Sequence, residues 1–412
     1  MANTTFASND PLTHKIWSKG TMAFALQNMA LLPLMGNTPE SIIYTKKDLT
    51  VEPGDTITFS ADENDTNDPG QGDDGTTEGN EVALRRRNMK VEVHERAQGT
   101  RPAGKMTMQR TDIHKTAGFR SFAKRKLGIW SQEAWEKDLV NCAAGLYNEN
   151  SSGAAIETIN ESYPTTNRIR YGGQNIGATP ALGPTYATDA LLTAGTPANN
   201  LFGTLVINAV RAKALSASPR FRLGKFYQTP RSADGSLDQR NRMAQKLIAQ
   251  MYTVLAHPYQ INSMRSEVGN IGWNQMVAAC AARGDKHPIF AAGAVSWNGC
   301  VVMEYDRVPM RTGAGGVTLA EGFLLNAGRT ETSDACANTR SVCRAMFLGA
   351  QAICFAWAQM LQWHEDWYDG RIPRVIVDMI YGLKRTIFNA HGTSTPGEDE
   401  GIYCIDTEVI PT

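Results

Sequence analysis

The chain has 412 residues, of which 42% are hydrophobic and 20% are charged, a composition typical of a globular protein with apolar cores. A chain of this length is expected to fold into about two to four domains. Lysine plus arginine and aspartate plus glutamate each total 41, so the formal net charge is zero. A dedicated nucleic-acid-binding protein normally carries a basic excess that neutralises phosphates, and the lack of this excess argues against that class.

The apolar and cysteine patterns disfavour further classes of protein. The longest apolar stretches, residues 22–35 and 352–361, are interrupted or too short to span a bilayer, so no membrane partner is expected. The first stretch also lacks the small-residue cleavage site of a secretory signal peptide. The seven cysteines form no CxxC pair, which argues against a disulfide framework and a zinc ribbon. We expect them to be buried as small apolar residues in a reducing compartment.

The beginning of the chain predicts an arm followed by a long hairpin. Residues 1–50 are punctuated by proline and glycine, and one short helix is expected over residues 22–32, ending at Pro33. Residues 55–60 (DTITFS) alternate strand-forming side chains between two faces, and residues 91–94 alternate in the same way. Two strands on either side of one long polar loop predict a β-hairpin or an extended arm.

The loop of this hairpin and the segment after it carry opposite charge. Residues 61–84, here called the acidic segment, contain eight acidic residues and no basic residue. Residues 85–126, the basic segment, contain thirteen lysines and arginines and three acidic residues. An acidic projection beside a basic body favours head-to-tail contact between neighbouring copies, although both segments could also be ordinary solvated surfaces. The candidate contact residues are Asp62, Glu63, Asp65, Asp68, Asp73, Asp74, Arg85, Arg86, Arg87, Lys124, Arg125 and Lys126.

Downstream, the pattern predicts a mixture of helices and strands. The clearest amphipathic helix covers residues 131–147, and residues 111–126 are expected to extend it towards the N-terminus. Glycine and proline dominate residues 172–197, which indicates a loop and a domain boundary. The helix over residues 342–360 is inferred from apolar and small residues that recur every three or four positions. The elements expected after the boundary are helices over residues 201–215, 273–283 and 342–360, and strands over residues 251–256, 299–308, 374–377 and 402–409.

Motifs of the common catalytic classes are absent from the sequence. It contains no GxxxxGK[ST], GxSxG or HExxH, and no GxGxxG that follows a strand. His364, Glu365 and Asp366 are adjacent, so on a helix they would point in different directions and could not share a metal ion. The acidic segment lacks the glycine spacing of an EF-hand. We therefore expect no enzymatic activity, no cofactor and no metal site.

A series of short segments follows one specific order along the chain. The segments are 48–50 (DLT), 53–59 (PGDTITF), 78–81 (EGNE), 104–110 (GKMTMQR), 257–260 (HPYQ), Trp273, 283–284 (RG), 288–290 (PIF), 298–299 (NG), 306–309 (DRVP), 348–352 (LGAQA) and 382–385 (GLKR). Together they resemble the major capsid proteins of tailed phages of the coliphage N-four type. The resemblance covers most of the chain, and it depends on the number and order of the segments.

This resemblance implies an α+β protein with the Hong Kong 97 phage-type capsid fold. It implies a major capsid protein that self-assembles into the icosahedral shell enclosing the double-stranded DNA genome of a tailed phage. The implied parts are an N-terminal arm (1–54), an extended loop (55–98), a peripheral domain with a long spine helix (99–200), an axial domain (201–369) and strands that return to the peripheral domain (370–412).

The resemblance also implies partners and a location. The partners would be other copies of the chain in pentamers and hexamers, a portal, scaffold and cement proteins where the system uses them, and packaged DNA contacted non-specifically. The protein would reside in the virion capsid after assembly in the host bacterial cytoplasm. Two alternatives stay open at this point: a decoration or tail component of a phage, and a soluble cytoplasmic enzyme with an unrecognised site. Closed particles formed by the chain alone would exclude the first, and a compact monomer with a deep pocket would favour the second.

Overall fold

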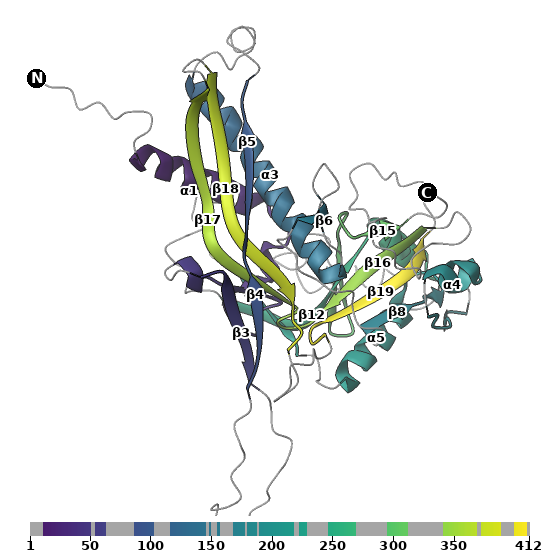
Figure 1. The fold of residues 1–412 in the computed structure, drawn as a ribbon. Coiled ribbons are helices and arrows are strands. Elements are labelled where there is room, and N and C mark those ends of the chain that lie inside the picture. Colours follow the sequence, from purple (N-terminus) through teal and green to yellow (C-terminus); the bar gives the residue numbers. More distant parts are fainter. Residues whose placement is uncertain are drawn as a thin grey trace, which may run out of the picture.

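The computed structural model contains two large β-sheets that meet near one end of the longer sheet, with a long helix running beside that sheet (Figure 1). Among the residues that the structure describes, no helix is long and apolar enough to cross a membrane. The structure describes residues 11–50, 54–62, 86–102, 116–145, 148–149, 155–156, 168–177, 179–187, 189–217, 222–228, 246–268, 295–311, 341–368, 372–388 and 399–409.

The first sheet, here called the long sheet, has five strands in the order β1–β2–β17–β18–β5. β17 and β18 form an antiparallel ribbon, β5 is antiparallel to β18, and β2 is parallel to β17. Buried and half-buried residues alternate along most of β18, because only one face of the sheet is covered by helices. The bounds are β1 Met35–Gly36, β2 Ile43–Lys46, β17 Ile353–Tyr368, β18 Ile372–Arg385 and β5 His94–Thr100.

The second sheet, here called the wide sheet, has the strand order β13–β14–β12–β16–β19–β8, with β11 paired to β12 and β15 paired to β16. Every residue of β16 and β19 is buried, as expected for central strands that are covered on both faces. Asn298 and Gly299, both with positive φ, close the β13–β14 hairpin in the manner of a two-residue type I′ turn. The bounds are β8 Ile169–Tyr171, β11 Gly224–Gln228, β12 Lys246–Ala256, β13 Val295–Trp297, β14 Cys300–Glu304, β15 Met310–Arg311, β16 Ser341–Leu348 and β19 Ile402–Val409.

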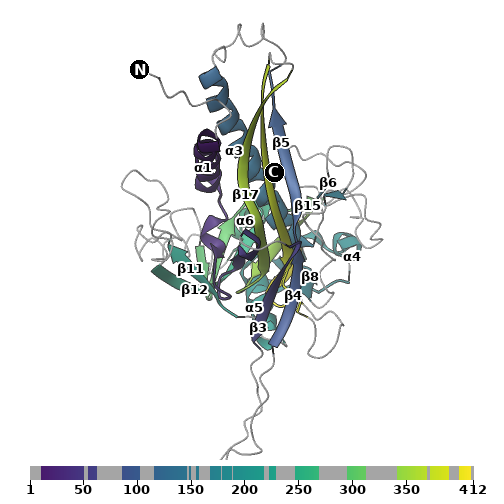
Figure 2. The ribbon, with the colours of Figure 1, turned by 60° about the vertical axis from the view of Figure 1, so that its left-hand side comes forward.

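Helices pack against both sheets. α3 (Thr116–Ala144) and α1 (Pro11–Asn28) lie together on the same face of the long sheet (Figure 2). The ring of Trp135 on α3 meets the ring of Trp357 on β17 edge-on, with centroids 5.3 Å apart. α5 (Thr204–Ser216) and α6 (Pro258–Arg265) bury their apolar residues against the wide sheet. The remaining short elements are η1 Leu32–Leu34, η2 Asp48–Thr50, β6 Asn148–Glu149, β7 Ala155–Ile156, β9 Gln174–Asn175, β10 Ala181–Leu182, α4 Asp189–Ala194 and η4 Pro197–Asn199.

The predicted hairpin is confirmed at its base. β3 (Thr56–Asp62) pairs with β4 (Arg86–Glu92) in antiparallel register, and the chain then continues into β5 of the long sheet. The inward-facing residues Ile57, Phe59, Met89 and Val91 pack against Cys354, Ala356 and Phe388. The hairpin therefore has a firmly packed base, and in Figure 1 it leads away from α3.

The predicted helix over residues 342–360 is wrong. These residues form β16 of the wide sheet, a tight turn at residues 349–352, and the start of β17 in the long sheet. Because every position of β16 is buried, the apolar residues at helical spacing are matched by equally buried residues between them. An apolar run of this kind does not distinguish a buried strand from a buried helix, and the aromatic and β-branched residues in it favour a strand.

Several other predicted elements are confirmed, with shifted bounds. The N-terminal helix is α1, which begins before residue 22 and ends at Asn28. The two predicted helices over residues 111–126 and 131–147 form the single helix α3. The remaining confirmed elements are α5, β12, β14, β18 and β19. The helix predicted over residues 273–283 lies outside the described residues.

Candidate functional site

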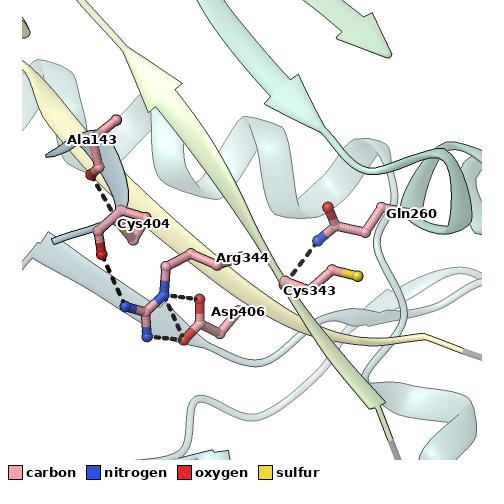
Figure 3. A network of polar contacts seen from close by, with 7 residues as sticks. Ala143, Gln260, Cys343, Arg344, Cys404 and Asp406 are labelled. Carbon is pink, nitrogen blue, oxygen red and sulfur yellow. Dashed lines mark hydrogen bonds and ion pairs between the residues drawn. The ribbon is translucent and has the colours of Figure 1, made fainter. Parts of the chain in front are cut away.

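A buried ion pair lies where the C-terminal end of α3 meets the wide sheet (Figure 3). Arg344 on β16 lies directly opposite Asp406 on β19, and both side chains are fully buried. Arg344 donates from Nε to Oδ1 at 2.8 Å and from Nη2 to Oδ2 at 2.6 Å, the two-pronged geometry that arginine forms with a carboxylate. Its Nη1 donates to the backbone oxygen of Ala144, the last residue of α3, at 3.1 Å. The pair therefore joins the end of α3 to two central strands.

Two further ion pairs fix α3 to the long sheet. Arg120 near the start of α3 donates from Nε and Nη2 to the carboxylate of Glu365 on β17, at 2.9 and 3.1 Å. Arg96 on β5 pairs with the buried Asp138 of α3, which also accepts a hydrogen bond from the hydroxyl of Tyr381 on β18. Burial lowers the pKa of Arg96, but the adjacent Asp138 carboxylate outweighs burial and raises this pKa above its ordinary value. The helix is thus attached to both sheets along its length.

α1 and the residues just after it contact both β17 and α3. The ring of Trp17 stacks on that of Trp363 on β17, with centroids 5.7 Å apart. Just after α1, the backbone N–H of Ala30 donates to Glu136 of α3 at 2.6 Å. These contacts make the N-terminal helix a part of the layer that covers the long sheet.

Arg87, one of the candidate contact residues, is engaged within its own chain. It forms an ion pair with Glu400, in the segment that leads into β19. Burial raises the pKa of Glu400, while the neighbouring Arg87 acts in the opposite direction. The pair links the base of the hairpin to the connection between the two sheets.

The other described candidates differ in exposure. Arg86 on β4 and Arg125 and Lys126 on α3 are exposed. Lys124 is half-buried against α1, where a Cβ built at Gly20 would lie 3.0 Å from the lysine Nζ. Only the backbone of Asp62, at the end of β3, is described; Glu63, Asp65, Asp68, Asp73, Asp74 and Arg85 lie outside the described residues. A contact between the acidic and basic segments therefore stays a prediction.

Side chains from two distant segments cap the N-terminus of α5, a feature that sequence reasoning missed. The Gln174 side-chain oxygen accepts from the backbone N–H of Leu205 at 2.6 Å. Glu267 accepts from the backbone N–H and the hydroxyl of Thr204, at 3.1 and 2.7 Å. Gly203 occupies the N-cap position and has no side chain with which to cap the helix, so acceptors come from elsewhere. The glycine at the N-cap position was the sequence signal that a side chain from another segment has to cap this helix.

A polar cleft of about 500 Å³ opens between α3, α6 and the turn after β14. Four of its charged side chains form ion pairs: Glu136 lies 3.5 Å from Arg307, and Glu304 lies 3.0 Å from Arg265. Burial raises the pKa of Tyr305 in the same cleft, and the neighbouring Glu136 adds to this, so the phenol stays neutral. Within the described part of the chain, no group of three or more His, Cys, Asp or Glu residues is arranged to hold a metal ion. The cleft therefore lies between elements that ion pairs join to one another, α3 to the turn after β14 and α6 to β14.

Comparison with known proteins identifies the family. The sequence profile of the phage capsid protein family matches residues 5–410. No curated protein sequence matches the chain. Among solved structures, the capsid of Ralstonia phage GP4 is 20% identical over 100% of this chain and 99% of its own, with a TM-score of 0.64.

Two further solved structures share the fold. The capsid of cyanophage Pam1 is 17% identical over 100% of both chains, with a TM-score of 0.59. The head of Helicobacter pylori bacteriophage KHP40 is 10% identical over 93% of this chain and 91% of its own, also with a TM-score of 0.59. At such identities the likeness concerns the fold alone. Together with the family match, the α+β fold confirms the predicted resemblance: the chain belongs to the phage capsid protein family, as a major capsid protein of a tailed phage with the Hong Kong 97-type fold.

Proposed function

We propose that copies of this chain assemble into pentamers and hexamers that close into an icosahedral shell around double-stranded DNA. The family match over residues 5–410 is the observation that carries the proposal. The chain acts in it as a building unit, and its function does not require catalysis. Each copy would use several interfaces of ordinary size, about 1,000–2,000 Å² each, and contacts that are weak singly suffice because each copy is held by several at once.

The same proposal includes the other partners and the place of assembly. A portal, and scaffold and cement proteins where the system uses them, would join the shell, and the packaged DNA would be contacted without sequence preference. The zero net charge supports a container, because a strongly basic lining would bind the genome and hinder its packaging and release. Assembly would take place in the host bacterial cytoplasm.

We assign the domains of the subunit by its two sheets. Residues 1–54 would form the N-terminal arm and residues 55–98 the extended loop. The long sheet with α3 would be the peripheral domain, and the wide sheet with α5 and α6 the axial domain. β17 pairs with β18, so this assignment moves residues 353–368 from the axial domain of the sequence-based division to the peripheral domain. β8 and β19 belong to the wide sheet, so it also moves residues 169–171 and 402–409 from the peripheral domain to the axial domain.

We further propose that the acidic segment of one copy lies over the basic segment of a neighbouring copy. Opposite charge supports this, and Arg86 on β4 is an exposed residue at which the contact can be tested. Arg86→Glu should lower the particle yield about fivefold, and more at low salt, where charges are less screened. Lys19→Glu, an exposed charge reversal on α1 outside the basic segment, is the matched control. Equal yields for Arg86→Glu and wild type at both salt concentrations would contradict the contact.

Electron microscopy of the purified recombinant chain, combined with size-exclusion chromatography, tests the main proposal. Closed shells, or isolated pentameric and hexameric rings, are the expected result. A single monomeric species at all salt and crowder concentrations, unchanged when portal and scaffold are co-expressed, would refute it.

A further inference from the structure

The turn of the β13–β14 hairpin contains the only asparagine in the sequence that is followed directly by glycine. Asn298 and Gly299 are the two central residues of this turn, with φ of 43° and 73°, and both are exposed. Such a turn is closed by the backbone of its two outer residues, so it does not use the N–H of Gly299. β13 is only three residues long and lies at the end of the strand order of the wide sheet. The turn can therefore open locally at a low cost in free energy.

An arginine on α5 lies beside both central residues of the turn. Nη1 of Arg211 donates to Oδ1 of Asn298 at 3.2 Å, and a Cβ built at Gly299 would lie 3.5 Å from Nη2 of the same arginine. Nδ2 of Asn298 donates to Oδ1 of Asn208, about one helical turn earlier on α5, at 2.8 Å. Oδ1 of Asn208 also accepts from Nε1 of Trp297 at 3.1 Å. The side-chain amide of Asn298 is thus held against α5, with a cation beside its carbonyl oxygen and beside the next residue.

These groups are the ones that take part when an asparagine modifies itself. Hydroxide removes the proton from the backbone nitrogen of the next residue, and this nitrogen forms a bond to Cγ of the asparagine. Negative charge collects on Oδ1, the bond from Cγ to Nδ2 breaks, and the nitrogen takes a proton from water and leaves as ammonia. Water then opens the resulting succinimide ring at either carbonyl carbon, which gives aspartate or isoaspartate. A glycine at the attacking position leaves the approach open, and a cation beside the oxygen stabilises the charge that develops there.

We propose that Asn298 is a site of spontaneous modification, at which Arg211 promotes closure of the succinimide ring on Gly299 and the product loosens the hairpin tip from α5. A carboxylate oxygen replaces Nδ2 in the product and cannot donate to Oδ1 of Asn208, so this hydrogen bond is lost. The new ion pair with Arg211 is exposed to solvent and contributes little in return. In isoaspartate the backbone also runs through the side-chain carbon, so the turn no longer has the geometry of a two-residue hairpin loop. Because each copy reacts independently, the fraction of altered hairpins records the age of the protein.

Mass spectrometry of the purified full-length chain, digested after incubation at mildly alkaline pH, tests the proposal. The exchange of NH₂ for OH should appear at Asn298 before any other asparagine, at a rate that rises in proportion to the hydroxide concentration, and chromatography should resolve aspartate and isoaspartate products. Arg211→Gln should slow the reaction about tenfold, because a donor to a developing oxyanion contributes about 100-fold in a closed site and less where water screens it.

Three controls isolate the role of Arg211 in the folded chain. In urea, where α5 no longer lies beside the turn, Arg211→Gln and wild type should react at the same rate. Lys213→Gln removes a charge from an exposed position of the same helix and should leave the rate in the folded chain unchanged. Asn298→Gln should abolish the early mass change at this position, because glutamine would have to close a larger ring.

The consequence for the hairpin is tested with the product itself. Asn298→Asp introduces the carboxylate directly, so the amide hydrogens of β13 and of the start of β14 should exchange faster than in wild type, whereas those of β16 should not change. Unchanged exchange in β13 would overturn the loosening of the hairpin tip.

Two results would overturn the modification site. One is a folded chain in which Asn298 stays intact while the chain in urea reacts completely. The other is an Arg211→Gln variant that reacts as fast as wild type or faster in the folded state. Both results would leave shell assembly standing, because the reaction takes place within one copy.

Discussion

Asp406→Ala removes one partner of the most deeply buried ion pair that joins α3 to the wide sheet. Arg344 would keep its charge at 0% exposure without the carboxylate opposite it, while its hydrogen bond to the backbone oxygen of Ala144 stays in place (Figure 3). Leaving one member of a buried pair uncompensated costs about 3–5 kcal/mol. The two bonds that are lost, at 2.8 and 2.6 Å, give a similar sum, because each charge-assisted hydrogen bond contributes about 1.5–3 kcal/mol.

Urea titration followed by tryptophan fluorescence measures this loss, with wild type and variants compared in the same oligomeric state. The free energy of unfolding should fall by about 4 kcal/mol for Asp406→Ala. The double variant Arg344→Met with Asp406→Leu removes both charges, so it should lie within about 2 kcal/mol of wild type. A loss below about 1 kcal/mol for Asp406→Ala, or an equal loss for the double variant, would refute the reasoning that an unpaired buried charge dominates.

Two further predictions concern backbone packing and buried thiols. A Cβ at Gly382 would lie 1.8 Å from the carbonyl oxygen of Glu92, so Gly382→Ala should lower the free energy of unfolding by about 3 kcal/mol in the same titration. Gly99→Ala is the control, because its new Cβ would lie 3.4 Å from Cγ1 of Ile376, and it should change the free energy of unfolding little. Burial raises the pKa of the Cys300 and Cys404 thiols to about 12, so neither should react with iodoacetamide at pH 8 until urea unfolds the chain. Because these pKa values in the folded chain exceed the ordinary value of 9.0, the free energy of unfolding should fall as pH rises from 9 towards 12. Rapid labelling of the folded chain, or a free energy of unfolding that does not change over this pH range, would contradict the burial of these two thiols.

Elements with a repeating pattern of exposure could be predicted from the sequence. The hairpin strands β3 and β4 bury alternate residues, such as Ile57 and Phe59, and leave the residues between them largely exposed to solvent. Apolar and polar residues therefore alternate in the sequence, which is the pattern that predicts a strand. α3 buries one face over eight turns, which is why the predicted helices over residues 111–126 and 131–147 lie on it. Such patterns arise because one face of an element meets the core and the other meets water.

The pattern disappears where both faces of an element are covered. β16 buries every residue, including Arg344, so its sequence carries neither a period of two nor a polar face. The ion pairs of α3 were also beyond prediction, because Arg120 and Glu365, or Arg96 and Asp138, are far apart in the chain and look like ordinary charged residues. Only the folded structure shows that these charges are removed from the surface and paired.

The position of β19 in the wide sheet constrains the order in which the subunit can be completed during synthesis. β19 lies between β16 and β8, although it follows every other strand of that sheet along the chain. Until residues 402–409 have left the ribosome, β16 and β8 lack the strand that joins them, and Arg344 lacks its carboxylate. A nascent chain therefore cannot present a finished wide sheet to its neighbours, which delays assembly until translation has passed this strand.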